Sequence, residues 1–430
     1  MTAPTGYRHL VPLLAACLLA FVIPFPFIFG AVGVAVLAVV TVCFQGRYLI
    51  FNLRKRKLLW LPIVLYLWTL CTWFWSADKG EAASILSTKF SLFLLPLVLG
   101  SSSLQDSVSR RRVLFSFATG VAVIGAYSMA SAWEAYLVSR DANVLFYHQL
   151  VDGLETNAVY MAWYVVTAIL FLLVTPPDPA RSGKVLWVRG LLFAVLLPFF
   201  FLLAARTLLF LFLVGVLPVI FLGSFRKKVA FPQKIMTWVF SGVVVLATVL
   251  AMRQPAIQAR FRELNHSRPE LSFLQHYQGE EAQFSNLNVR LFLWRVGWEE
   301  LTSSTKTFLA GTGVGDTHAA INKRIAALGI PNMEQDASPR NPFYNINLHN
   351  TFLHTALATG LPGIVLLLAV VFCLLIAGFR AFPQKPFLLF FTLLALAFMM
   401  QEAVLETQAG TIFFMFIWSL YYSPTKRLER

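Results

Sequence analysis

Long apolar runs constrain the fold of this 430-residue chain more than any other feature of its sequence. The runs are roughly 15 to 23 residues long, close to the length that an α-helix needs to cross the hydrocarbon core of a bilayer. Only 13% of the residues are charged, whereas a soluble domain averages about 25%. We therefore predict an all-α, polytopic membrane protein.

The apolar runs predict about twelve transmembrane helices, joined by one large helical outer loop. The first run is interpreted as a helix and not as a signal peptide, because no small-residue cleavage site follows Ile23. We expect three parts, with helices one to nine in residues 1–252, the outer loop in 253–347 and helices ten to twelve in 348–430. The predicted spans are 10–23, 27–44, 58–75, 85–100, 113–133, 157–174, 190–204, 207–223, 235–252, 348–378, 387–402 and 408–422.

The basic residues predict the orientation of the chain. If both termini are cytoplasmic, the segments on that side hold 21 of the 35 Lys and Arg residues but only three of the 20 acidic residues. The positive-inside rule favours this arrangement, which places the large loop on the outer face. The net charge of +15 is then mainly a topology signal, and we expect no nucleic-acid partner.

His349 is the leading candidate for chemistry. It lies with His354 where the longest polar segment ends and an apolar run begins, and an ionisable residue at the mouth of a membrane helix is a functional candidate. Farther along the same run, Gly360, Pro362 and Gly363 predict a break about one third of the way down the helix.

Arg206 is the second candidate, because it is the only charge in the apolar stretch 190–223. As one helix this stretch would extend about 51 Å, well beyond a hydrocarbon core of roughly 30 Å, so it must turn back. The predicted turn lies on the outer face and carries Arg206. The side chain either anchors the hairpin at the lipid headgroups or contacts a ligand, and we favour the ligand.

The outer loop supplies a third candidate, Arg290, in a predicted helix at 288–301. Leu291, Trp294 and Trp298 share one face of that helix, which suits the membrane interface. Arg290 precedes Trp294 by one turn, so its guanidinium group can stack on the indole ring or reach a phosphate.

The glycines of Gly311–Gly315 stand just before another helical pattern, at 317–328. No strand precedes them, so we do not interpret them as a dinucleotide-binding motif. They predict a tight turn followed by a capped helix.

Three further ionisable residues lie near the outer ends of predicted spans. Lys89 either extends its amine to the interface or lies near an anionic ligand. Glu402 and Glu406 flank the turn between the last two spans, where either acid can orient a histidine, bind sugar hydroxyls or stay hydrated. The sequence does not distinguish these alternatives.

Arg206, Arg290 and His349 come from separate segments but are predicted to meet on one side of the membrane. Two guanidinium groups can clamp a diphosphate, and a nearby neutral imidazole can take a proton from an attacking hydroxyl. This combination favours transfer from a diphosphate-linked donor. No Ser-His-Asp spacing, zinc signature or paired-carboxylate motif is evident, so we predict no metal site.

The chain resembles the O-antigen ligase family, within the broader superfamily of O-antigen ligases and polymerases. The main motif is His349-Asn350, nine intervening residues and Gly360-Leu361-Pro362-Gly363. Ala205-Arg206, Arg290 with Trp294 and the Gly311–Gly315 turn also match, although many relatives have Ser where this chain has Ala205. The pattern of twelve spans with a large loop between the ninth and tenth extends the resemblance over the whole chain.

The resemblance implies a GT-C-like glycosyltransferase of the bacterial inner membrane with its active site on the periplasmic face. Such ligases move a polysaccharide from undecaprenyl diphosphate to the lipid A core, with inversion at the anomeric carbon and without cofactor or metal. Arg206 and Arg290 would bind the diphosphate, and His349 would activate the acceptor hydroxyl. Glu402 or Glu406 would match a functional acid of the family, and Asn350 and Lys89 are further candidates for substrate contact. We expect a monomer surrounded by membrane lipids.

Three alternatives remain. An O-antigen polymerase or a protein O-oligosaccharyltransferase would use the same donor and a different acceptor. A transporter of lipid-linked glycans would use the arginines to bind a head group without chemistry. We favour this last function least, because the two halves of the chain share no evident repeat.

Overall fold

The computed structural model describes residues 5–154, 156–175, 182–216, 267–279, 283–330, 346–382 and 386–421, with a few single positions between 238 and 258. Within these ranges the chain is all-helical and contains no strand, which confirms the predicted all-α class. The number of transmembrane spans, the GT-C-like architecture and the three-part division of the chain stay predictions.

Helices occupy the predicted spans that lie within the described residues, and the ninth predicted span, 235–252, lies largely outside them. Short 3₁₀ or π segments extend several of the helices. The helices in these regions are α1 (Tyr7–Val22), α2 (Phe27–Lys55), α3 (Trp60–Thr72), α4 (Lys79–Lys89), α5 (Ser91–Leu95), α6 (Ser107–Ser139), α8 (Ala158–Val174), α9 (Ser182–Leu202), α10 (Arg206–Phe210), α17 (Thr351–Ala381), α18 (Phe387–Met399) and α19 (Gln408–Tyr421).

The lengths and surfaces of these helices fit a bilayer. Four helical stretches among the described residues are long and apolar enough to cross a membrane: Phe27–Lys55, Lys79–Gly100, Ser107–Ser139 and Thr351–Ala381. On α2, apolar side chains such as Ile28, Val32 and Val39 are exposed along the helix. Exposed apolar side chains in this pattern are expected where lipid, and not water, surrounds the helix.

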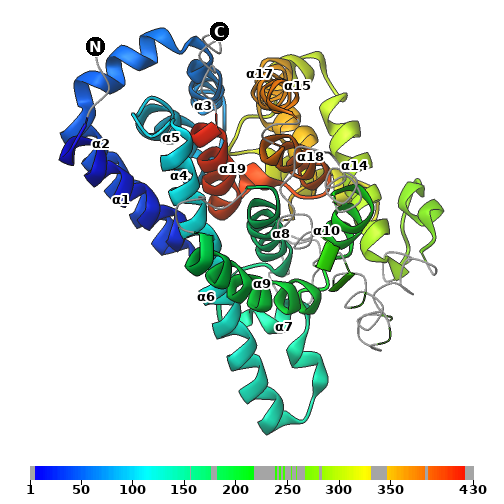
Figure 1. The fold of residues 1–430 in the computed structure, drawn as a ribbon. Coiled ribbons are helices and arrows are strands. Elements are labelled where there is room, and N and C mark those ends of the chain that lie inside the picture. Colours follow the sequence, from blue (N-terminus) through cyan, green and yellow to red (C-terminus); the bar gives the residue numbers. More distant parts are fainter. Residues whose placement is uncertain are drawn as a thin grey trace.

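The main core is built around α8, which lies near the centre of the helical bundle with α9, α18 and α19 around it (Figure 1). Trp163 of α8 is fully buried and packs its ring against Phe398 of α18 and Phe413 of α19. Aromatic rings at these spacings stabilise packing beyond the area they bury. The α1–α2 hairpin lies on one flank of the bundle, and residues 267–330 lie on the opposite flank.

The described part of the outer loop forms a second, smaller core of its own. It contains a 3₁₀ turn (Pro269–Phe273), α14 (Asn286–Leu301), α15 (Thr305–Ala310) and α16 (Thr317–Ala327). Phe292, Leu293 and Val296 of α14 are buried in this core, together with Leu357 of α17. The predicted helix at 288–301 is therefore confirmed, and its packing ties the outer segment to the first turns of α17.

The predicted break in the tenth span is also confirmed. Gly360 has a φ of 66°, and α17 bends at this point. A bend of this kind frees carbonyl oxygens of the preceding turn, which then need other donors. The N–H groups of Thr312 and Gly313 donate to the oxygens of Leu357 and Ala358 at 2.8 and 3.2 Å. The indole of Trp68 in α3 donates to Thr359 O at 2.8 Å.

The glycine-rich turn at 311–315 therefore has a structural role that the sequence did not reveal. Gly311 has a φ of 78°, and a Cβ at that position would lie 2.5 Å from the carbonyl oxygen of Ala358. The turn is as predicted, but the predicted cap of the next helix is wrong. The carboxylate of Asp316 makes no capping bond to α16 and accepts instead from the N–H groups of Ala77 and Asp78, at 2.7 and 2.9 Å.

Candidate active site

His349 lies in the turn that leads into α17. Its φ is 44°, a left-handed conformation that is costly for residues other than glycine. Hydrogen bonds fix this turn on both sides. The side chain of Asn347 accepts from the N–H of His349 at 2.9 Å, and the indole of Trp294 donates to His349 O at 3.3 Å. Asn350 caps α17 by accepting from Phe352 N and Leu353 N.

Glu402 connects His349 to Arg290. Its Oε1 lies 2.8 Å from Nη2 of Arg290, and its Oε2 lies 3.1 Å from Nδ1 of His349. We refer to Arg290, Glu402 and His349 as the pocket triad. The carboxylate is 7% exposed, whereas the arginine and the histidine are each 27% exposed. The acid is thus covered by the two groups that it holds, and these two groups remain accessible.

The surroundings keep Glu402 ionised. The guanidinium group of Arg290, 2.8 Å from one carboxylate oxygen, and the hydrogen bond of His349 to the other oxygen both favour the ionised form. An ionised carboxylate accepts hydrogen bonds only, so Nδ1 of His349 carries the proton that faces Glu402. In the neutral imidazole, the other ring nitrogen, Nε2, then has the lone pair and can accept a proton.

Arg206 reaches the same region from another part of the bundle. The apolar stretch 190–223 turns back after α9, as predicted, with Ala204 at a φ of 45°, and Arg206 is the first residue of α10. Arg206, Arg290 and Glu402 all line one open pocket, whose cavity volume is about 50 Å³. The pocket is lined by Tyr147, Val159, Ala205, Arg206, Thr207, Leu208, Asn286, Arg290, Phe398, Gln401 and Glu402.

Residues 401–406, which we call the 401–406 loop, join these separate segments. The hydroxyl of Thr207, next to Arg206, donates to Oε1 of Gln401 at 2.6 Å. The hydroxyl of Thr351 donates to Glu402 O at 2.7 Å and accepts from Val404 N at 2.9 Å. The loop thus contacts the starts of both α10 and α17, which carry two of the predicted site residues.

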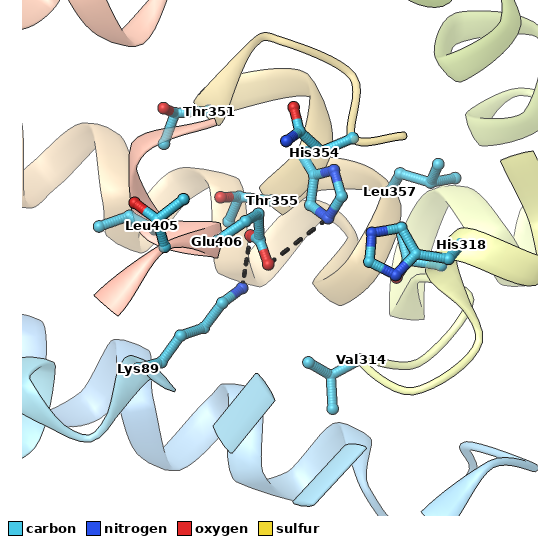
Figure 2. Close-up of polar contacts among 12 residues, drawn as sticks. Lys89, Val314, His318, Thr351, His354, Thr355, Leu357, Leu405 and Glu406 are labelled. Atoms are coloured by element: carbon cyan, nitrogen blue, oxygen red, sulfur yellow. Dashed lines mark hydrogen bonds and ion pairs between the residues drawn. The ribbon is translucent and has the colours of Figure 1, made fainter. Parts of the chain in front are cut away.

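Lys89 and Glu406 lie in a different cluster, together with His354 (Figure 2). Nζ of Lys89 is 2.6 Å from Oε1 of Glu406, and Nε2 of His354 is 3.5 Å from Oε2 of the same acid. The three side chains are 4%, 7% and 1% exposed, and we refer to them as the buried triad. None of them is among the residues that line the pocket.

A second histidine, His318, lies beside the buried triad, with its ring centre 5.9 Å from that of His354. Its Nδ1 is 3.0 Å from Oε1 of Glu81, which is 39% exposed. The cluster therefore continues towards the surface on the side of α4 and α16.

The fold and the pocket define a helical membrane protein in which two guanidinium groups, a carboxylate and an imidazole gather from separate segments. Residues 190–368 match the family described as O-antigen ligase, which supports the resemblance seen in the motifs. A search of curated proteins found no match. The family match supports the interpretation that the protein is an enzyme that transfers glycosyl groups in O-antigen biosynthesis and acts on lipid-linked polysaccharides.

The matched segment contains Arg206, Arg290 and His349, whereas Lys89, Glu402 and Glu406 lie outside it. Sequence reasoning did not identify Glu402 as the partner of both Arg290 and His349, nor did it identify Tyr147 as a residue of the pocket. The motif that runs from His349-Asn350 to Gly360-Leu361-Pro362-Gly363 contains neither residue, so it gave no information about Glu402 or Tyr147.

Proposed function

We propose that the protein is an O-antigen ligase, which transfers a polysaccharide from undecaprenyl diphosphate to a hydroxyl of the lipid A core. The reaction would invert the anomeric carbon and need no metal. It would take place on the periplasmic face of the bacterial inner membrane, with both termini of the chain in the cytoplasm. The observation that carries the proposal is the pocket lined by Arg206, Arg290 and Glu402, with His349 bonded to the same glutamate.

The two arginines would bind the diphosphate of the donor. A guanidinium group presents several donors in one plane, so it binds phosphate oxygens in pairs. Arg290 donates to Glu402 through Nη2. This bond fixes the orientation of the guanidinium group and involves only one of its nitrogens. As the bond between the anomeric carbon and the diphosphate breaks, its electron pair stays on the diphosphate, where the arginines stabilise the added charge.

His349 would act on the acceptor. Because Nδ1 faces Glu402, Nε2 can take the proton of the acceptor hydroxyl while that oxygen forms its bond to the anomeric carbon. Attack from the side opposite the departing diphosphate inverts the configuration. The proton then resides on His349, and Glu402 stabilises the resulting imidazolium until the proton passes to water or to the diphosphate.

A reconstituted transfer assay tests this function with a lipid diphosphate-linked glycan, purified lipid A core and the His349→Ala variant. General base catalysis contributes about 10²- to 10⁴-fold to a rate, so we expect the variant to lose about that much. His276→Ala, at an exposed histidine of the outer segment, is the matched control and should transfer normally. Unaltered transfer by His349→Ala would remove the histidine from the reaction.

The product of the wild-type reaction identifies the acceptor. Glycan attached to the lipid A core supports the ligase. Glycan extended on a second lipid-linked chain would identify a polymerase, and glycan on a Ser or Thr hydroxyl would identify a protein O-oligosaccharyltransferase. Donor binding without any transfer would favour the transporter.

A further inference from the structure

The residues that line the pocket are of two kinds. Six are polar, namely Arg206, Thr207, Asn286, Arg290, Gln401 and Glu402. Five are mainly apolar, namely Tyr147, Val159, Ala205, Leu208 and Phe398. The arginines suit the diphosphate, and the apolar side chains suit the parts of the donor that carry no charge.

The mainly apolar residues of the lining differ in exposure. Leu208 and Phe398 are 1% and 2% exposed and belong to helices of the bundle. Tyr147 is only partly buried and comes from the connection between α6 and α8, where residues 140–143 are exposed. The lipid chain of a membrane donor must continue into the bilayer, whereas its sugars lie outside it. Of these residues, Tyr147 is therefore the one that suits the sugar.

The backbone at Tyr147 is held in an unusual conformation. Among the described residues other than glycine, a positive φ occurs at Arg140, Tyr147, Ala204 and His349. Arg140 has a common reason, since it ends α6 in a left-handed cap. Of the other three, Tyr147 lines the pocket, Ala204 directly precedes the lining residue Ala205, and His349 is bonded to the lining residue Glu402. Such conformations cluster where the surrounding structure imposes a functional geometry.

Packing fixes the position of Tyr147. The short helix α7 (Tyr147–Leu150) and the turn after it bury Leu150, Val151 and Leu154 in the main core. The ring of Tyr147 lies against the ring of His148, with 3.9 Å between the centres. The aromatic face is thus placed at the pocket by buried residues that follow it in the chain.

We propose that Tyr147 is a substrate-contacting residue whose ring packs on the sugar attached to the donor diphosphate. This inference rests on the proposed function. A pyranose has a C–H face that is apolar, and a tyrosine ring offers an apolar surface with a hydroxyl at its edge for a sugar oxygen. The first sugar is bonded directly to the phosphate that the arginines hold, so it must lie beside them within the same pocket. Tyr147 makes the enzyme prefer glycan-bearing lipid over bare lipid diphosphate.

The test compares two probes on the full-length protein in lipid nanodiscs: a polyprenyl diphosphate without sugar, and the same lipid carrying one sugar on the diphosphate. Tyr147→Ala should weaken binding of the sugar-bearing probe by roughly three- to tenfold and leave binding of the bare probe unchanged. Tyr147→Phe keeps the ring and should retain most of the preference. Equal weakening of both probes, or no weakening of either, would overturn the proposal.

Two controls separate loss of the ring from loss of folding. Tyr147→Asn also removes the ring, but asparagine tolerates a positive φ, so this variant should bind like Tyr147→Ala while its melting temperature stays at or above that of the wild type. Tyr136→Ala removes a tyrosine of α6 that does not line the pocket, and it should bind both probes normally. A loss of selectivity in Tyr136→Ala equal to that in Tyr147→Ala would overturn the proposal, because the selectivity would then not come from the ring at the pocket.

A further variant separates a failure of this inference from a failure of the proposed function on which it rests. Arg290→Lys should weaken both probes, because both carry the diphosphate. If the wild type binds neither probe, the proposed function itself fails. If the wild type binds both and Arg290→Lys weakens both while Tyr147→Ala has no effect, only the assignment of Tyr147 is wrong.

Discussion

The pocket triad and the buried triad contain similar groups in opposite surroundings. Each has a glutamate of the 401–406 loop, a histidine from the start of α17 and a basic residue from elsewhere in the chain. In the pocket triad the basic residue is an arginine that is 27% exposed, whereas Lys89 of the buried triad is 4% exposed. The two triads contain nearly the same chemical groups, so access to a ligand is what distinguishes the proposed catalytic cluster from the buried one.

The choice of basic residue fits this difference. Arginine can hold Glu402 with one part of its guanidinium group and still present other donors to a phosphate. The compact ammonium of Lys89 lies against Glu406 with little exposed surface. Glu402 lies near the start of the 401–406 loop, and Glu406 is its last residue. The buried triad therefore anchors the end of the loop, while the pocket triad lies at its start.

The largest effect is expected from replacing a pocket arginine by lysine, which keeps the charge and loses the planar group of donors. Arg206→Lys or Arg290→Lys should reduce the rate of transfer by about 10²- to 10³-fold, the usual effect of removing one well-placed donor at a developing charge. Initial rates with a lipid diphosphate-linked glycan measure this.

The matched control is Arg268→Lys, which alters an exposed arginine of the outer segment that does not line the pocket. It should transfer at nearly the wild-type rate. Near-normal transfer by Arg206→Lys would remove Arg206 from the diphosphate site.

The buried triad should affect stability more than chemistry. Lys89→Met leaves Glu406 without its cation, and removing one partner of a buried ion pair costs about 3 to 5 kcal/mol of unfolding free energy. The double variant Lys89→Met/Glu406→Gln removes both charges and should regain much of that loss. Denaturant unfolding of the purified proteins in detergent measures both.

Lys323→Met serves as the control, since Lys323 of α16 is an exposed lysine. It should unfold like the wild type. If Lys89→Met were fully stable but bound the lipid diphosphate more weakly, Lys89 would be a substrate contact and the comparison between the two triads would break down.

The smallest effect is expected from a chelator. Among the described residues, no group of three His, Cys, Asp or Glu side chains could hold a metal ion, and in the proposed mechanism the guanidinium groups supply the positive charge that a divalent cation often supplies. Transfer by the purified enzyme should therefore proceed at the same rate with excess chelator. An absolute requirement for a divalent cation would contradict the mechanism.

Much of the architecture follows from the sequence because its causes are local. Apolar runs define helices, and a chain too long for one crossing must turn, which located the start of α10. Gly360 and Pro362 cannot continue a regular helix, which located the bend of α17. The predicted topology placed Arg206, Arg290 and His349 on one side of the bundle, since Arg206 and His349 lie at predicted outer ends of spans and Arg290 lies in the predicted outer loop.

The details of the site depend on contacts that no local pattern encodes. Glu402 and Glu406 are both acids of one short loop, and the direction of each depends on how α18 ends at Met399 and on the bonds from Thr351. No feature of the sequence indicated that Tyr147 would line the pocket. A tyrosine at a positive φ is disfavoured locally, so only the buried residues around α7 can hold it there.

The bend of α17 has a consequence for how this protein can change through evolution. Backbone groups of the glycine-rich turn complete hydrogen bonds that the bent helix leaves open, between positions 45 apart in the chain. A side chain added at Gly311 would collide with the helix, and a straightened helix would leave the turn without its acceptors. The two glycine stretches therefore form one epistatic unit, in which the effect of a mutation in either stretch depends on the residues present in the other.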